Sequence, residues 1–196
     1  MKKILLATLL FITPTWATSA TAADYQIDVE GMHAAINFRV RHVGISWLTG
    51  RFDKFDGTFS YDENDLAASK VSVDIEVGSV NSNHETRDNH ILEADYLNVE
   101  ANPIAHFEST SIDLTGDDTG IIHGNLTLNG VTKPFDLDAT FVGQGDDPWG
   151  GYRAAFDATA TMNPDDFDFK FKYGEVFLSF YVEGVRINED GSVATH

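Results

Sequence analysis

The segment from Gly124 to Phe141 reads GNLTLNGVTKPFDLDATF and indicates the fold class. From Phe135 onwards, apolar residues occupy every second position with polar residues between them. This alternation is typical of a β-strand with one apolar face and one wet face. Asn129-Gly130 separates the segment from alternating residues before it. Because Asn-Gly is a strong signal for a two-residue hairpin, the sequence predicts two antiparallel strands joined by a tight turn.

The same alternation recurs along the chain and predicts eight or nine antiparallel strands. Within the third of these strands, Phe52 and Phe55 are three residues apart, which breaks the alternation of two. A β-bulge between them would keep both rings on the inner face. The first strand could continue into the second. We expect the strands near residues 24–30, 33–42, 50–61, 69–77, 103–114, 120–129, 131–141, 151–162 and 175–187.

One segment departs from the strand pattern. Residues 82–97 read SNHETRDNHILEADYL and predict a short helical segment. Ser82 or Asn83 could cap this helix, and Glu85 falls in its first turn. The apolar residues that could face inward are Ile91, Leu92 and Leu97.

Many strands of similar length predict a single all-β domain, which is either a sandwich or a closed barrel. Eight strands close into a barrel that is filled by side chains or holds one small ligand. The inward positions of this chain combine many phenylalanines with many alanines. Such a mixture can pack into a solid core or leave an elongated apolar tunnel, and both arrangements stay open at this point.

The composition excludes several classes of function. The 196 residues include 31 acids, 13 lysines and arginines and no cysteine, for a formal charge of −18. This charge argues against a nucleic-acid partner and against docking on anionic lipid through a polybasic patch. Without cysteine, the chain has no disulfide scaffold, thiol nucleophile or cysteine-ligated metal.

The first 22 residues have the features of a signal peptide. Lys2 and Lys3 precede an uncharged run, ILLATLLFI at residues 4–12, which is too short to span a bilayer. The A-x-A site at residues 20–22 predicts a mature chain that starts at Ala23. A cut one residue later and an uncleaved N-terminal anchor are the alternatives. We therefore expect a signal peptide at 1–22, a single domain at 23–196 and a periplasmic location.

Motifs for catalysis and cofactor binding are missing from the sequence. It contains no G-x-S-x-G elbow, P-loop or dinucleotide fingerprint. The seven histidines are scattered without the spacing of metal ligands. The sequence therefore predicts no enzymatic activity, no cofactor and no metal site.

Five segments, taken in order, carry a family resemblance. They are HAAINFRVRHVGISWL (33–48), GRFDKFDGTF (50–59), the helical segment from residue 83 to 97, GNLTLNGVTKP (124–134) and GQGDDPWGG (143–151). Together they resemble the YceI-like family of periplasmic, lipocalin-like, polyisoprenoid-binding proteins, and most closely its proteobacterial branch. One departure is that the family's late Asn-Arg-x-Asp-Phe-Gly stretch corresponds to MNPDDFD at 162–168, which lacks the Arg.

The resemblance implies an eight-stranded antiparallel lipocalin-like barrel with a helical segment over one side. It also implies that a polyisoprenoid or quinone-like lipid lies inside the barrel, for transport, storage or sensing. The alternatives are a periplasmic enzyme that acts on a lipid-like substrate, and a filled barrel that serves as a stress or interaction module without a ligand. We expect no stable membrane anchor, and both a monomer and a homodimer remain open.

The candidate ligand contacts form two groups. His42, Arg87 and His90, with Arg39 and Arg41 nearby, could contact a polar head group, although His42 could also be a core histidine and the other two could anchor the helix. An apolar bore would be lined by Phe38, Val40, Phe52, Phe55, Phe59, Leu92, Phe107, Leu126, Leu128, Phe156, Ala158 and Phe180. Aromatic and apolar residues expected in turns, which could form a lip at the cavity, are Trp47, Leu48 and Trp149.

Overall fold

The computed structural model describes residues 22–62, 64–170 and 174–194. Within these ranges the chain forms one antiparallel sheet with a short helix and three 3₁₀ turns. The strands are β1 (Ala23–Ile27), β2 (Ala34–His42), β3 (Ser46–Phe52), β4 (Phe55–Tyr61), β5 (Lys70–Glu76), β6 (Val80–Asn81), β7 (Ile104–Leu114), β8 (Thr119–Leu128), β9 (Val131–Asp146), β10 (Tyr152–Met162) and β11 (Val176–Arg186). The helix is α1 (Glu85–Ile91).

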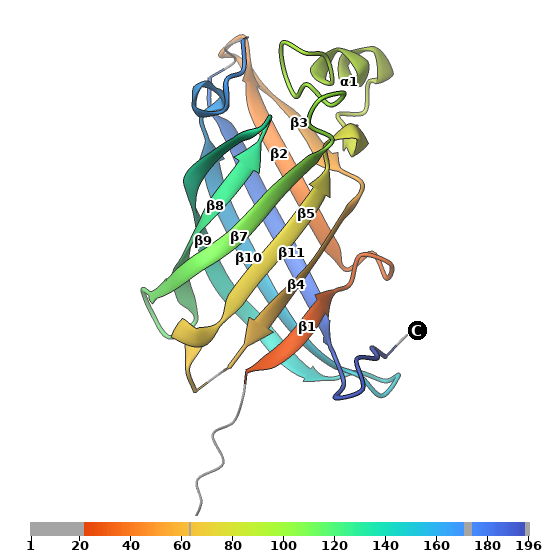
Figure 1. Ribbon diagram of the computed structural model, residues 1–196, viewed down its shortest axis with the longest axis vertical. Helices are drawn as coiled ribbons and strands as arrows, with labels where there is room; N and C mark the ends of the chain where they lie inside the picture. The colour runs from red at the N-terminus through yellow and green to blue at the C-terminus, as the bar shows by residue number, and fades with distance from the viewer. Residues whose placement is uncertain (1–21, 63, 171–173, 195–196) are drawn as a thin grey trace, which may run out of the picture.

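The sheet closes on itself into a barrel of eight strand positions (Figure 1). β1 and β2 pair with successive parts of β11 and therefore occupy one position. β3 and β4 share the next position, because β3 pairs with β2 and β4 pairs with β1. β5 and β6 share the third, and β7 to β11 supply the other five. The prediction of an eight-stranded antiparallel barrel with one short helical segment is confirmed.

The predicted single strand at 50–61 is wrong in one respect, because it is split into β3 and β4 rather than bulged. At the split, the backbone N–H groups of Asp53 and Lys54 donate to the backbone carbonyl and the hydroxyl of Ser79. Ser79 lies in the 3₁₀ turn Val77–Ser79, where the neighbouring strand is also interrupted. Two adjacent strands therefore break at the same level.

Helix α1 lies over one end of the barrel (Figure 1) and is shorter than the predicted segment at 82–97. Its N-cap is His84, whose Nδ1 accepts a hydrogen bond from the Arg87 backbone N–H, so the prediction of Ser82 or Asn83 as the cap is wrong. The Ser82 hydroxyl instead accepts from the Nε–H of Arg87 at 2.7 Å. This bond fixes the start of the helix to the chain that leaves β6.

An ion cluster centred on Arg153 of β10 ties strands together near the other end of the barrel. Its guanidinium donates at 2.6 Å to both Asp28 and Glu183, and at 2.8 Å to Asp147. Burial alone would lower the pKa of Arg153, but the hydrogen bonds to these three carboxylates raise it above its ordinary value. The cluster joins the β1–β2 loop, the β9–β10 turn and β11.

The predicted signal peptide lies outside the described residues except for Ala22, so its cleavage stays a prediction. Over the ranges that the structure describes, the helix is too short to cross a membrane.

Candidate ligand-binding cavity

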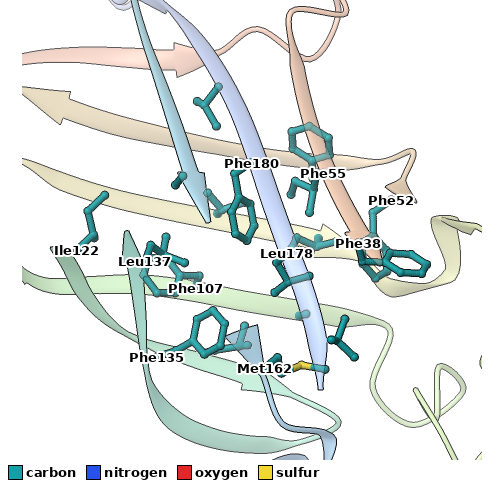
Figure 2. A pocket seen from close by; sticks show the side chains of 18 of the residues that line it. Phe38, Phe52, Phe55, Phe107, Ile122, Phe135, Leu137, Met162, Leu178 and Phe180 are labelled. Carbon is teal, nitrogen blue, oxygen red and sulfur yellow. The ribbon is translucent and has the colours of Figure 1, made fainter. Parts of the chain in front are cut away.

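The barrel encloses a cavity of about 1200 Å³. Inward-facing side chains from strands around the whole barrel line it, and nearly all of them are apolar. Figure 2 shows phenylalanine and leucine side chains from several strands directed toward a shared interior space. The volume lies above the usual range of about 300–1,000 Å³ for small-molecule pockets, so the interior has room for a large apolar ligand.

Glycines explain why an interior so rich in phenylalanine is hollow. The Phe38 ring lies against Gly50, its direct partner in the β2–β3 register. The Phe107 ring lies against Gly124 of the neighbouring strand, two positions from its register partner Leu126, and a methyl group on either glycine would overlap the ring. Because these rings lie flat along the sheet, they cover the wall without crossing the bore.

A row of small residues widens one side of the cavity. Gly120 of β8 pairs with Ala139 of β9, which pairs with Ala158 of β10. All three line the cavity. Across three adjacent strands the wall therefore has almost no side-chain depth, and Phe180 of β11 closes the row on one flank.

The two ends of the cavity differ in charge. Arg41, His42, Arg87 and His90 line it at the α1 end, together with Tyr96. At the opposite end the ionisable wall residues are Asp117 and Asp118 in the β7–β8 turn. An anionic or hydrogen-bond-accepting group is therefore favoured at the α1 end.

The predicted head-group residues are brought together, but their local bonding differs. Arg87 donates to the backbone carbonyl of Ser82 at 2.6 Å, and His90 Nε2 lies 2.6 Å from the Tyr96 hydroxyl. These bonds fix the two side chains in place, as the anchoring interpretation requires, while leaving them on the cavity wall. The His42 side chain is exposed and forms no hydrogen bond to any residue that the structure describes, so it is not a satisfied core histidine.

Eleven of the twelve predicted bore residues lie on the cavity wall, and Leu92 does not. Leu92 follows the end of α1 as its C-cap and packs against the buried cluster that contains Leu97. Its neighbours Ile91 and Leu97 line the cavity instead. The predicted residues on the wall are Phe38, Val40, Phe52, Phe55, Phe59, Phe107, Leu126, Leu128, Phe156, Ala158 and Phe180.

The three residues predicted for a lip do not form one. Trp47 and Leu48 belong to β3 rather than to a turn, and only Leu48 lines the cavity. Trp149 does lie in the β9–β10 turn, but it is not on the cavity wall.

The sequence analysis missed Ser69, whose hydroxyl is buried on the cavity wall without a hydrogen-bond partner among the described residues. No sequence pattern distinguishes this serine from its neighbours, because its burial depends on the path of the turn before β5. A polar atom of a bound molecule could satisfy this hydroxyl.

Ionisable clusters outside the cavity have partners within the protein. In the described part of the chain, one group of three residues, Asp28, His33 and Glu183, has the spacing of metal ligands. The guanidinium of Arg153 already bridges its two carboxylates, so a cation occupies the place of a metal.

His123, on the outer face of β8, contacts a different aspartate with each ring nitrogen. Its Nδ1 is 2.8 Å from Asp136 and its Nε2 is 3.2 Å from Asp113. Hydrogen bonds to Asp136 and Asp113 raise the pKa of His123 above its ordinary value. The two carboxylates lie on opposite sides of the ring, so the three groups do not converge on one point.

Comparison with known proteins identifies the same family that the motifs resemble. Residues 25–194 match the model of the YceI-like domain. Protein YceI of Escherichia coli O17:K52:H18 is 52% identical over 190 residues, which are 95% of this chain and 99% of that protein.

Two solved structures are similar in fold. BcnA of Burkholderia cenocepacia has a TM-score of 0.71 and 18% identity, over 80% of this chain and 98% of that chain. A polyisoprenoid binding domain from Saccharophagus degradans has a TM-score of 0.63 and 16% identity, over 83% of this chain and 98% of that chain. At these identities the likeness establishes the barrel fold alone.

Proposed function

Because the chain belongs to the YceI-like family, we propose that its barrel binds a long isoprenoid chain or a similar amphiphilic lipid. The single observation that carries this proposal is the apolar cavity of about 1200 Å³ inside the barrel. The likeness in fold to a polyisoprenoid binding domain supports it. Each CH₂ group moved from water into such a cavity contributes about 0.8 kcal/mol before ordering costs, so a long chain needs few polar contacts.

In this proposal the polar head of the lipid lies at the α1 end, beside His42, Arg87 and His90. A phosphate or a quinone carbonyl would accept hydrogen bonds from these side chains, whereas Asp117 and Asp118 at the opposite end would repel a phosphate. The protein would act as a binding protein rather than an enzyme, and would carry, store or sense its lipid in the periplasm.

The test of binding is organic extraction of the purified protein followed by mass spectrometry. We expect a prenyl lipid in a molar amount close to that of the protein. Repeated extraction of protein that melts cooperatively, with no lipid recovered and no uptake of added octaprenyl lipid, would refute the proposal.

His42→Ala tests the position of the head group. Since burial of the chain dominates affinity, we expect the variant to change the preference among octaprenyl alcohol, phosphate and quinone more than it changes overall affinity. Complete loss of binding with an intact fold would contradict this, and so would an unchanged preference. Cell fractionation and the mass of the purified chain test the periplasmic location and the cleavage before Ala23.

A further inference from the structure

The hairpin tip between β2 and β3 exposes apolar side chains beside the cavity. Val43 is 75% exposed and Ile45 is 83% exposed. Val43 and Gly44 also line the cavity, so the tip forms part of its rim. In Figure 1 this hairpin reaches the same end of the barrel as α1.

The requirements of folding do not account for an apolar residue at position 43. Val43 has a φ of 48°, in the left-handed region that is strained for a β-branched residue. Glycine or asparagine would adopt this turn conformation at lower cost. A valine that is both strained and exposed indicates a contact outside the barrel.

Next to the tip, arginine side chains lie over aromatic rings. The guanidinium carbons of Arg41 and Arg39 lie 3.9 Å and 4.4 Å from the centre of the Trp47 ring. The Phe177 ring of β11 meets Trp47 edge-on, with 5.4 Å between the ring centres. Tryptophan and arginine with apolar stems are suited to the headgroup layer of a bilayer, where one end is apolar and the other is wet.

Charge selects the kind of surface that this end would meet. Residues 31–52 contain no Asp or Glu and three arginines, although the chain as a whole has a net charge of −18. The hairpin is therefore a locally cationic segment on an acidic protein. An anionic surface would attract this segment and repel the rest of the barrel, so contact would orient the molecule.

We propose that the tip residues Val43 and Ile45, with Arg39, Arg41 and Trp47 behind them, dock the α1 end of the barrel on an anionic phospholipid bilayer. Two apolar side chains with a few cations give weak and reversible binding rather than anchoring. The cavity rim then faces the source or destination of a lipid. Docking does not depend on which ligand fills the cavity, so it can be tested even if isoprenoid binding fails.

The test is flotation of the purified, processed protein with vesicles of phosphatidylglycerol and phosphatidylethanolamine, and with vesicles of phosphatidylcholine alone. The test variant is Val43→Asn combined with Ile45→Asn. Met32→Asn is the matched control, because Met32 is also exposed at 81%, has a φ of 61° and lies in the β1–β2 loop away from the cavity.

We expect the wild type and Met32→Asn to float with the anionic vesicles at low salt and not with phosphatidylcholine. The bound fraction of the double variant should fall by at least about tenfold, because most of the inserted apolar surface is lost. Its melting temperature should not fall, because asparagine relieves the strain at position 43. Ile45→Asn alone leaves the cavity wall unchanged, because Ile45 does not line the cavity. Reduced flotation of this single variant, with uptake of octaprenyl lipid from detergent equal to that of the wild type, would separate docking from cavity binding.

Three results would overturn the proposal. The first is no flotation of the wild type with any vesicle, and the second is equal flotation of the double variant. The third is a concentration-dependent dimer, without flotation, that the double variant abolishes, because the tip would then be an interface between copies of the chain.

Discussion

Ala158→Phe should shorten the cavity from within. Ala158 lies in the row of small residues on β8, β9 and β10, where the wall has almost no side-chain depth. A phenyl ring at this position projects into the bore, because neither of its register partners, Ala139 and Phe180, is a glycine that would let it lie flat. The ring therefore takes space that a lipid chain would use.

The expected size of the effect follows from the length of chain displaced. A ring that excludes one isoprene unit removes five carbons from the apolar interior, at about 0.8 kcal/mol per carbon. The upper limit is a loss of about 4 kcal/mol, or about a thousandfold in Kd. Because a flexible chain can partly fold around the ring, we expect between about tenfold and this limit.

The assay is a Kd series over isoprenoid alcohols of increasing length. Ligands too short to reach position 158 should bind the variant and the wild type equally, whereas longer ligands should lose affinity only in the variant. Thr159→Phe, on the exposed outer face of the same strand, is the matched control. If Ala158→Phe does not fold, Ala139→Leu tests the same wall. Equal affinities of the wild type and a folded variant across the whole series would refute the reasoning.

Three further predictions concern stability. Gly50→Ala should force the Phe38 ring away from the wall and lower the free energy of unfolding in urea by about 1–3 kcal/mol. Adding Phe38→Ala should remove part of this loss, so strictly additive effects of the two substitutions would contradict the contact. Arg153→Met should lower the free energy of unfolding by about 3 kcal/mol at pH 7, because it leaves buried carboxylates unpaired. The loss should be smaller at pH 4, where these carboxylates take up protons, and an equal loss at both pH values would argue against charge as the cause. Because the pKa of His123 is raised in the folded protein, protonated His123 stabilises the fold. This contribution is fully present below the pKa of the unfolded chain, about 6.5, and is lost as pH rises through the pKa of the folded protein. His123→Gln should therefore lower the melting temperature at pH 5.5 but not at pH 8.5, and the reverse pattern would show that the sign is wrong.

Local patterns predicted the strands and their inner faces. Successive side chains of a strand point to opposite faces whichever strand lies beside it. Phe38, Phe107 and Ala158 could therefore be assigned to the interior from sequence alone. The helical segment was also found, although its cap and length were wrong. His84 accepts the Arg87 backbone N–H as the cap, whereas Ser82 accepts from the Arg87 side chain.

Features that depend on pairing between strands could not be predicted. Whether the bore is filled or hollow depends on the pairing of Gly50 with Phe38 across two strands. The sequence of one strand does not show which residues of the next strand pair with it. The split between β3 and β4 likewise depends on the turn at Val77–Ser79 in the adjacent strand. The assignment of Leu92 to the cavity failed for a similar reason, because the packing of α1 on the barrel decides whether it or Ile91 faces inward.

The pairing that closes the barrel has a practical consequence for engineering. Tyr25 of β1 stands opposite Arg186 of β11, and the Ile187 N–H donates to the Asp24 carbonyl at 2.8 Å. The first and last strands therefore meet side by side, away from helix α1 (Figure 1). A peptide linker could join them head to tail, which would permit circular permutation. A tag or solid support attached there would hold every molecule in the same orientation, with its α1 end facing the solution.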